Sequence, residues 1–165
     1  MMKRWLLVLL PLAACGDDPP DITGLYMTTS HEESNEGCAG GATPADSPPY
    51  FRIEEREILG LPYRTRSDCQ DTEPASCSGG GGLLVDEIDG GYRGDAYLAS
   101  GDSSACTLVY SSYEATLADS TLSYHNRNHS ESGAIDPCTT DEAEARGDAM
   151  PCTSYELIAG VRVDE

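Results

Sequence analysis

Short runs in which apolar and polar residues alternate, separated by turn residues, constrain this chain more than any other feature. The most regular run is "TSYELIAGVRV", in which every second residue from Tyr155 to Val163 is apolar or aromatic. Because successive side chains of a β-strand point to opposite faces, this period predicts strands. The pattern predicts eight of them, at residues 22–30, 50–59, 61–68, 83–89, 92–99, 106–116, 121–128 and 153–163.

The segment "TTDEAEARG" carries the one helix signal. Thr139 is the expected N-cap, Glu142 is its capping-box partner three residues later, and Gly147 is the expected stop. These signals predict one or two helical turns within a loop of an otherwise all-β protein.

The connections between the expected strands fall into two kinds. Three are tight, at residues 59–62, 89–91 and 118–120, and four are longer, at 31–49, 69–82, 100–105 and 129–152. If consecutive strands pair as antiparallel hairpins, the two kinds alternate and lie at opposite ends of the strands.

Eight up-and-down strands in a single antiparallel domain favour a barrel, because closure removes the exposed edges of an open sheet. This architecture resembles the lipocalin-like group. The Gly-x-Trp of lipocalins is missing, and "TGLYMTTS" has Tyr26 where the Trp would stand. A β-sandwich is the alternative fold. An eight-stranded barrel encloses side chains or one small ligand, so the fold alone leaves a filled core and a pocket both open.

Six cysteines follow the first expected strand, and an even number in an exported chain predicts a disulfide framework. They are Cys38, Cys69, Cys77, Cys106, Cys138 and Cys152. A structural zinc site is the competing interpretation, but the sequence contains no Cys-x-x-Cys and no Cys-His cluster with finger spacing.

All six cysteines lie in or beside the longer connections, which predicts that the disulfides join loops at one end of the molecule. Two connectivities satisfy this placement. The preferred one follows chain order, Cys38–Cys69, Cys77–Cys106 and Cys138–Cys152. The alternative is Cys69–Cys77, Cys38–Cys106 and Cys138–Cys152.

The N-terminus has the parts of an export signal: Lys3 and Arg4, then an apolar run over residues 5–14 that is too short to span a bilayer. Leu12-Ala13-Ala14-Cys15 resembles the lipobox of bacterial lipoproteins. The resemblance implies removal of residues 1–14, acyl chains on Cys15, a tether over 15–21 and a β domain over 22–165. The alternative is an ordinary secretory signal, with Cys15 in a disulfide.

By the enterobacterial sorting rule, Gly16 after the lipidated cysteine implies delivery to the outer membrane of the cell envelope. Two or three acyl chains hold a soluble body firmly to the membrane. The first strand starts at the end opposite the disulfides, so we expect the disulfide-joined loops at the membrane-distal end.

Without residues 1–14 the chain has eight arginines and no lysine against 29 acidic residues, a formal charge of −21. This charge repels phosphate, so nucleic acid is not an expected partner.

Catalytic motifs are incomplete, and no enzyme activity, catalytic residue or cofactor is predicted. "HEESN" at His31 lacks the second histidine of a zincin, and "GDSS" at Gly101 is not followed by the Asp-x-x-His of a GDS-type esterase. His125 and His129 would share one face of a strand, with spacing that suits a metal, but no third ligand lies near them in sequence. We therefore expect no metal site and interpret both as exposed histidines.

Two functions remain open. The first is a non-catalytic, membrane-anchored envelope protein that binds a protein or surface polymer through its disulfide-joined loops, similar to the small cysteine-containing lipoproteins of Gram-negative bacteria. The alternative is a small-ligand carrier with a lipocalin-like pocket. The nine tyrosines, all on or beside expected strands, either fill a modest core or form a face that stacks sugars or cations.

Overall fold

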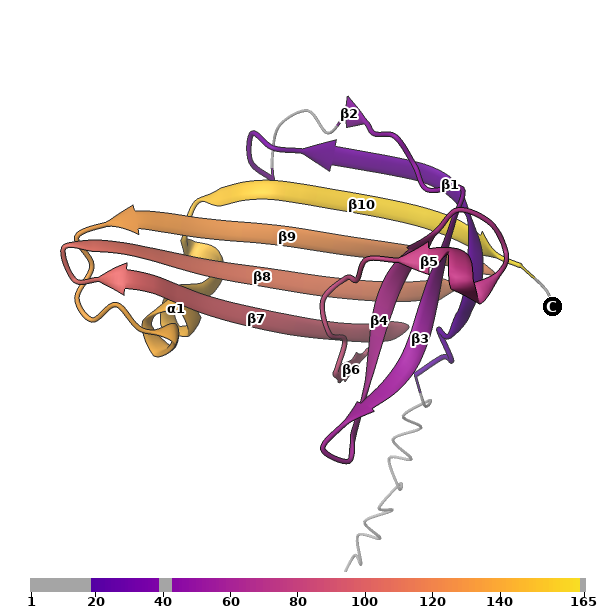
Figure 1. Cartoon of the computed structure of the whole chain (residues 1–165), viewed down its shortest axis with the longest axis horizontal. Helices are drawn as coiled ribbons and strands as arrows, with labels where there is room; N and C mark the ends of the chain where they lie inside the picture. The colour runs from indigo at the N-terminus through magenta and orange to yellow at the C-terminus, as the bar shows by residue number, and fades with distance from the viewer. Residues whose placement is uncertain (1–18, 39–42, 164–165) are drawn as a thin grey trace, which may run out of the picture.

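The computed structural model describes residues 19–38 and 43–163, so Cys15 and the expected signal lie outside the described residues. The described chain is mostly antiparallel strand, with one short α-helix (Figure 1). The strands are β1 (Gly24–Ser34), β2 (Thr43–Pro44), β3 (Tyr50–Ile58), β4 (Leu61–Cys69), β5 (Cys77–Ser78), β6 (Asp86–Ile88), β7 (Gly91–Asp102), β8 (Ala105–Ala118), β9 (Thr121–Gly133) and β10 (Cys152–Arg162). The helical segments are η1 (Pro74–Ser76), α1 (Thr140–Arg146) and η2 (Gly147–Ala149). All eight expected strands are present, and the two that were not expected, β2 and β5, are two residues long.

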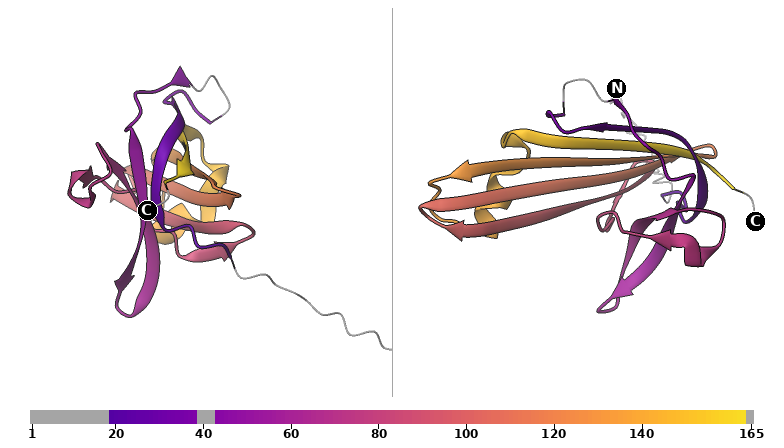
Figure 2. Two further views of the ribbon diagram at one scale, coloured as in Figure 1. Left: turned by 90° about the vertical axis from the view of Figure 1, so that its right-hand side faces the viewer. Right: turned by 45° about the horizontal axis from the view of Figure 1, so that its top comes forward.

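The strands form one sheet in the order β5-β4-β3-β1-β10-β9-β8-β7-β6, with β2 beside β1. Neighbours along the sheet follow chain order except at the centre, where β1 pairs with both β3 and the last strand, β10. The sheet curls (Figure 2), and its two arms meet at a bridge between Arg64 and Leu84, whose backbone N–H and C=O groups bond reciprocally. The barrel-like, all-β prediction is confirmed, and a single curled sheet replaces the two facing sheets of the alternative sandwich.

The tight turns lie where the sequence placed them. Leu59, Gly60, Gly90 and Asp119 all have positive φ, as the shortest hairpin turns require. The expected long connection at 100–105 is wrong. Asp102 pairs with Ala105 across a two-residue turn, and the Asp102 carboxylate accepts hydrogen bonds from the two backbone N–H groups that follow Ser103.

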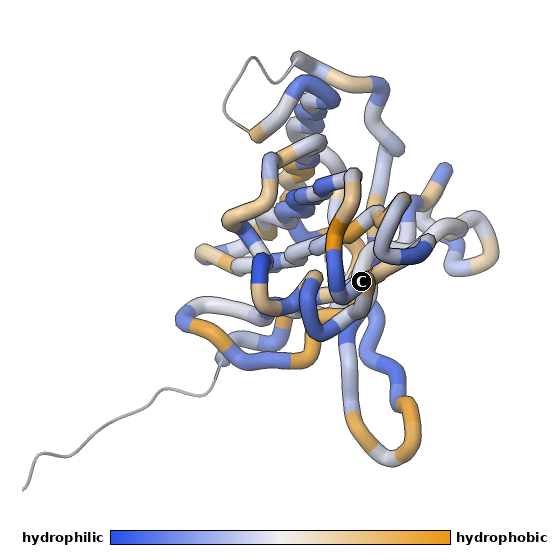
Figure 3. The backbone as a smooth tube through the Cα atoms, turned by 90° about the vertical axis from the view of Figure 1, so that its left-hand side faces the viewer, coloured by the Kyte–Doolittle hydropathy of each residue, from blue (hydrophilic) through white to orange (hydrophobic). Residues whose placement is uncertain are grey.

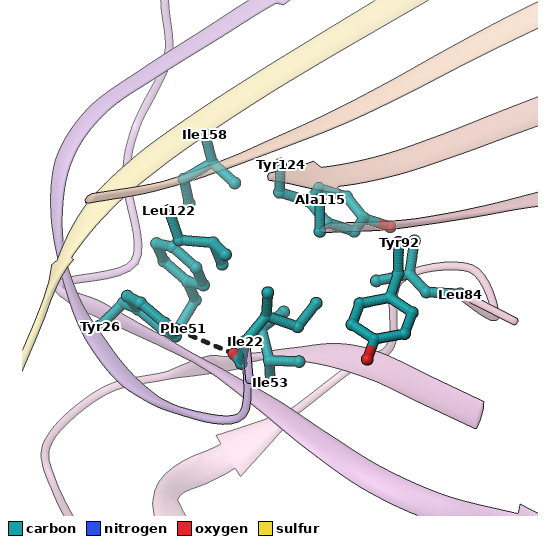
Figure 4. Packing of buried hydrophobic residues seen from close by; sticks show 10 residues of the cluster. All are labelled: Ile22, Tyr26, Phe51, Ile53, Leu84, Tyr92, Ala115, Leu122, Tyr124 and Ile158. Carbon is teal, nitrogen blue, oxygen red and sulfur yellow. Dashed lines mark hydrogen bonds between the residues drawn. The ribbon is translucent and has the colours of Figure 1, made fainter. Parts of the chain in front are cut away.

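The concave face of the curled sheet holds the larger of two hydrophobic clusters, here called the inner core (Figure 4). Its buried members are Ile22, Tyr26, Phe51, Ile53, Leu84, Tyr92, Ala115, Leu122, Tyr124 and Ile158. Tyr26 and Phe51 stack with ring centroids 5.3 Å apart, and the Tyr26 hydroxyl donates to the Ile22 carbonyl. Ile22, just before β1, therefore fixes the start of the described chain to the inside of the curl.

The smaller cluster, the outer core, packs helix α1 and its flanking loop on the opposite face of β7 and β8. Its buried members are Cys106, Leu108, Ile135, Ala143 and Met150. The helix begins as predicted, since the Thr139 hydroxyl accepts from the backbone N–H of Glu142, and it ends at Gly147. The Glu142 carboxylate bonds Arg146 one turn later, so only the Thr139 half of the expected capping box is observed.

The six cysteines form three disulfides, Cys38–Cys152, Cys69–Cys77 and Cys106–Cys138. Chain-order pairing is therefore wrong. The alternative connectivity is right for Cys69–Cys77 and wrong for the other two bridges.

The disulfides also do not share one end of the molecule. Across the sheet, Cys69 of β4 pairs with Tyr50 of β3, and Tyr50 pairs with Met27 of β1. Met27 in turn pairs with β10 near its C-terminal end, so Cys69 lies level with that end of the long strands. Cys106 pairs with Gly133 at the other end of the long strands. The reason is that β3 and β4 cross the direction of the long strands, so the loop after β4 does not join the loops after β7 and β9 (Figure 1).

Candidate functional site

A polar groove lies on the convex face of β7, β8 and β9, next to the outer core. The groove encloses about 380 Å³. Residues of alternating position supply most of its lining because successive side chains of a strand point to opposite faces. The lining residues are Cys38, Arg93, Asp95, Tyr110, Ser112, Tyr113, Glu114, His125, Arg127, His129 and Asp148.

One wall of the groove is a hydrogen-bonded group on β7 and β8. The Tyr110 hydroxyl donates to the Asp95 carboxylate at 2.9 Å, and Arg93 pairs with the other oxygen of Asp95 at 3.2 Å. Burial raises the pKa of Tyr110 to about 12, and the hydrogen bond to Asp95 adds to the rise. Tyr97 stacks on Tyr110 with ring centroids 5.3 Å apart, which fixes the ring at the border with the outer core.

The opposite wall is formed by side chains of β9, among them Arg127 and His125, with Tyr155 of β10 behind them. The Arg127 guanidinium lies 5.8 Å from the centroid of the Tyr155 ring, and the Tyr155 hydroxyl is 3.4 Å from Nδ1 of His125. Burial lowers the pKa of His125, and the nearby Arg127 lowers it further, so this imidazole is neutral at neutral pH. Among the described residues Arg127 makes no salt bridge, which leaves its charge available to a polar ligand.

His125 and His129 share one face of β9, as predicted, and both line the groove. They do not meet in a common site. His129 is buried, its Nδ1 lies 2.9 Å from the Met150 carbonyl, and its ring is tilted against Tyr110. The expectation that both histidines are exposed is therefore wrong for His129.

Two groups of side chains have ligand atoms close enough to hold a metal ion. In the first, His129 lies beside Cys38 and Cys152, but these two cysteines are joined in a disulfide and offer no thiolate. Sequence spacing could not have found this group, because its members come from three distant segments.

The second group lies on β1 and β10. Nε2 of His31 is 3.4 Å from Glu33 and 3.2 Å from Glu156, while Nδ1 is 3.0 Å from the Asp46 carbonyl. Arg66 already pairs with the same Glu156 oxygen at 2.8 Å. The first four residues of "HEESN" form the end of strand β1, and Asn35 follows it, so the motif lies in a strand and not in the helix of a zincin. Its His31 belongs to an internal ion-pair network with the side chain of the buried Arg66.

The other candidate motif lies in a turn. "GDSS" forms the end of β7 and the two-residue turn to β8, where the Asp102 carboxylate is occupied by the Ser104 hydroxyl at 2.6 Å and by backbone N–H groups. Sequence reasoning did not identify Arg93, Asp95, Glu114 or Arg127 as site residues. The signal was available in the alternation of β8 and β9, but the pairing register was needed to align it.

Comparison of the chain with protein-family models, with curated proteins and with solved structures finds no match. Within residues 19–38 and 43–163, no helix has the length and apolar character needed to cross a membrane.

Proposed function

We propose that this protein is an exported lipoprotein, anchored to the outer membrane through acyl chains on Cys15, whose folded body binds a partner without catalysing a reaction. The complete lipobox supports the anchor. Three disulfides in the described body support export, since disulfides persist in oxidising compartments.

We infer that the partner binds in the groove on the convex face. The observation that carries this inference is the composition of the groove, where Arg127, which makes no salt bridge among the described residues, shares one cavity with Asp95 and the ring of Tyr110. Rings of tyrosine stack on sugars, and the carboxylates and guanidinium groups beside them hydrogen-bond hydroxyl groups. The body is strongly acidic, so an uncharged sugar polymer fits this site better than an anionic one.

The disulfide-joined loops contribute to this site in part. Cys38 of one bridge lines the groove, and the Cys106–Cys138 bridge belongs to the adjoining outer core. The Cys69–Cys77 bridge lies elsewhere. We therefore assign the binding role to the middle of the long strands, where the groove lies on β7, β8 and β9.

A small-ligand carrier is the alternative function. It needs space inside the curl of the sheet, where the ten buried side chains of the inner core pack together (Figure 4). That packing favours the outer groove as the binding site. Mass spectrometry of the native protein under non-denaturing conditions tests the alternative, because a carrier would release a small molecule on unfolding.

The anchor is tested by Cys15→Ala. The variant should stay unprocessed, lack acyl chains by mass spectrometry, and leave the outer-membrane fraction. A variant that fractionates like the wild type would refute the lipoprotein assignment.

The groove is tested by Arg127→Ala, with Arg56→Ala as the matched control, since Arg56 is an exposed arginine on the β3–β4 hairpin. The probes are purified peptidoglycan sacculi, neutral dextran and anionic polygalacturonate in a co-sedimentation assay. We expect the wild type to bind a neutral probe or sacculi, and Arg127→Ala to weaken binding about tenfold, equivalent to one charge-assisted hydrogen bond. Equal binding by the two variants, or no binding by the wild type, would overturn the groove assignment.

A further inference from the structure

The tip of the β3–β4 hairpin is an exposed apolar surface without a partner among the described residues. Its side chains are Ile58, Leu59 and Leu61, which are 47%, 98% and 71% exposed. Figure 3 shows the tip as the apolar end of a hairpin that projects away from the rest of the body. Isolated exposed apolar side chains are common on proteins, but three at the end of one projecting hairpin form a continuous apolar tip.

The backbone conformation at the tip does not favour the leucine that occupies it. Leu59 has φ 53° and is followed by Gly60 at φ 83°. Asn, Asp and Gly favour the first of these positions, and a leucine there is uncommon and costs of order 1 kcal/mol. Since the folded body gains no contact from a side chain that is 98% exposed, folding does not account for this leucine.

The hairpin lies beside the start of the described chain. Pro19 and Asp21 line a shallow cavity together with Glu55 of β3 and Arg64 of β4. Asp21 is also fixed there, because its carbonyl accepts a hydrogen bond from Arg162. The described chain therefore begins beside the middle of the β3–β4 hairpin.

The length of the hairpin beyond Glu55 is similar to the length of chain between Pro19 and Cys15. From Glu55 to Leu59 the hairpin extends four residues, about 13 Å at the rise of a β-strand. From Pro19 back to Cys15 is also four residues, which span at most about 14 Å. Acyl chains on Cys15 and the tip at Leu59 are therefore able to reach the same plane.

We propose that the β3–β4 tip inserts into the phospholipid bilayer that holds the acyl chains of Cys15, as a second point of contact. This inference rests on the proposed lipid anchor. Tyr63, two residues from Leu61, has the amphipathic ring that suits the headgroup layer. The acidic Glu54, Glu55 and Glu57 close behind the tip oppose an anionic surface, so a zwitterionic bilayer is the preferred partner.

Two contacts with the membrane, the acyl chains and the inserted tip, fix the orientation of the folded body relative to the bilayer, whereas a single tether leaves it free to rotate. Because the hairpin crosses the direction of the long strands, insertion of its tip sets β7 to β10 along the membrane surface (Figure 1). The groove lies at the middle of these strands, so in this orientation it is displaced sideways along the membrane from the inserted tip.

Tryptophan fluorescence tests the insertion. The only tryptophan of the sequence is Trp5 in the expected signal, so Leu59→Trp creates a single reporter in the processed protein. Leu98→Trp is the matched control, since Leu98 is 57% exposed on β7, away from the hairpin. The lipidated proteins are reconstituted in phosphatidylcholine vesicles with and without brominated acyl chains. We expect a blue shift and quenching for Leu59→Trp only.

A second variant separates insertion from folding. Asn suits the backbone of residue 59, so Leu59→Asn should fold normally while losing most of the blue shift of a Leu61→Trp reporter. Absence of a shift in Leu59→Trp, or an equal shift in Leu98→Trp, would overturn the proposal.

Failure of the anchor is distinguished from failure of the tip by coupling residues 15–165 through the Cys15 thiol to a maleimide phospholipid. If native protein carries no acyl chains but the coupled protein shows the shift, the anchor assignment fails and the tip assignment stands. If the protein is acylated and shows no shift, only the tip assignment fails.

Discussion

The inner and outer cores lie on opposite faces of β8 and are built in different ways. The inner core draws on residues from Ile22 to Ile158, nearly the whole described chain. The outer core is smaller, and its buried members come from Cys106 to Met150. Only the outer core contains a disulfide, Cys106–Cys138, whose cysteines are 32 residues apart.

This contrast shows how a polar chain stabilises two clusters of unequal size. Where ten buried residues from most strands meet, burial of apolar area supplies the stability. Where one short helix covers only two strands, β7 and β8, little apolar area is available, and a covalent link limits the freedom of the unfolded loop. The following substitutions test that division.

The largest loss of stability is expected from Phe51→Ala in the inner core. Phe51 is fully buried and stacks on Tyr26, so removal of its ring should lower the free energy of unfolding by about 3–5 kcal/mol. Urea denaturation measures the change. Leu98→Ala is the control, and a loss for Phe51→Ala no larger than for this exposed leucine would contradict the central role of the inner core.

The double substitution of Cys106 and Cys138 by alanine should lower the free energy of unfolding by about 3.7 kcal/mol, the value that loop entropy gives for a separation of 32 residues. The effect should be local. Hydrogen exchange should quicken in α1 and at the start of β8 while the amides around Tyr124 keep their protection. Equal loss of protection in both cores would show that they unfold as one unit.

Thr139→Ala removes the side-chain acceptor for the backbone N–H of Glu142 at the start of α1. Loss of an N-cap costs about 1 kcal/mol, and the helix belongs to the outer core alone. Thermal unfolding checks the change against Thr140→Ala, which alters the neighbouring, exposed threonine. We expect Thr139→Ala to be less stable than Thr140→Ala by the contribution of one N-cap. Identical unfolding midpoints would show that the Thr139 cap does not stabilise the protein.

The smallest change at pH 8 is expected from Tyr110→Phe, which loses one hydrogen bond to Asp95, about 1 kcal/mol. Its effect depends on pH. The pKa of Tyr110 is raised to about 12 in the folded protein, above 10.0 for a free tyrosine, so the unfolded chain ionises first. Wild-type stability should therefore fall as the pH rises from 10 to 12, and Tyr110→Phe should fall less steeply. Parallel slopes in urea denaturation at these pH values would contradict the raised pKa.

The sequence predicted every long strand because alternation and turn residues are local signals. It predicted β9 only as far as residue 128, since "HNRNHSESG" lacks apolar alternation. Its second half is a strand because it pairs with β8, with Cys106 opposite Gly133. Pairing is a tertiary effect that a local pattern does not contain.

Alternation also does not say which face of a strand turns inward. In β10 the regular apolar set includes Tyr155 and Leu157, yet the inner core takes Ile158 from the other face. The reason lies at Gly160 on that face, where an added Cβ would come within 2.6 Å of the Phe51 ring. The absence of a side chain at Gly160 thus leaves space for the Phe51 ring of the inner core, and a pattern of apolar residues does not reveal such a position.

The groove and the disulfides were harder to predict for a related reason. The lining side chains become neighbours only through the register of β7, β8 and β9, for example Asp95 opposite Ser112. The disulfide prediction assumed that all strands are parallel or antiparallel to one axis. The crossing of β3 and β4 over the long strands breaks that assumption and moves Cys69 and Cys77 to another place.

The central position of β1 has a consequence for the order in which the chain acquires its structure. β1 is the first strand to be synthesised, but it pairs with β10, the last, so that Tyr26 lies opposite Arg162. Such distant pairing makes folding slow, and although β3 pairs with one edge of β1 early, the other edge stays unpaired until β10 is available. The order of oxidation should follow. Cys69–Cys77, eight residues apart, can close while the chain is still emerging, whereas Cys38 must wait for Cys152, 114 residues later. The last disulfide to form thus marks a molecule in which β1 and β10 have come together.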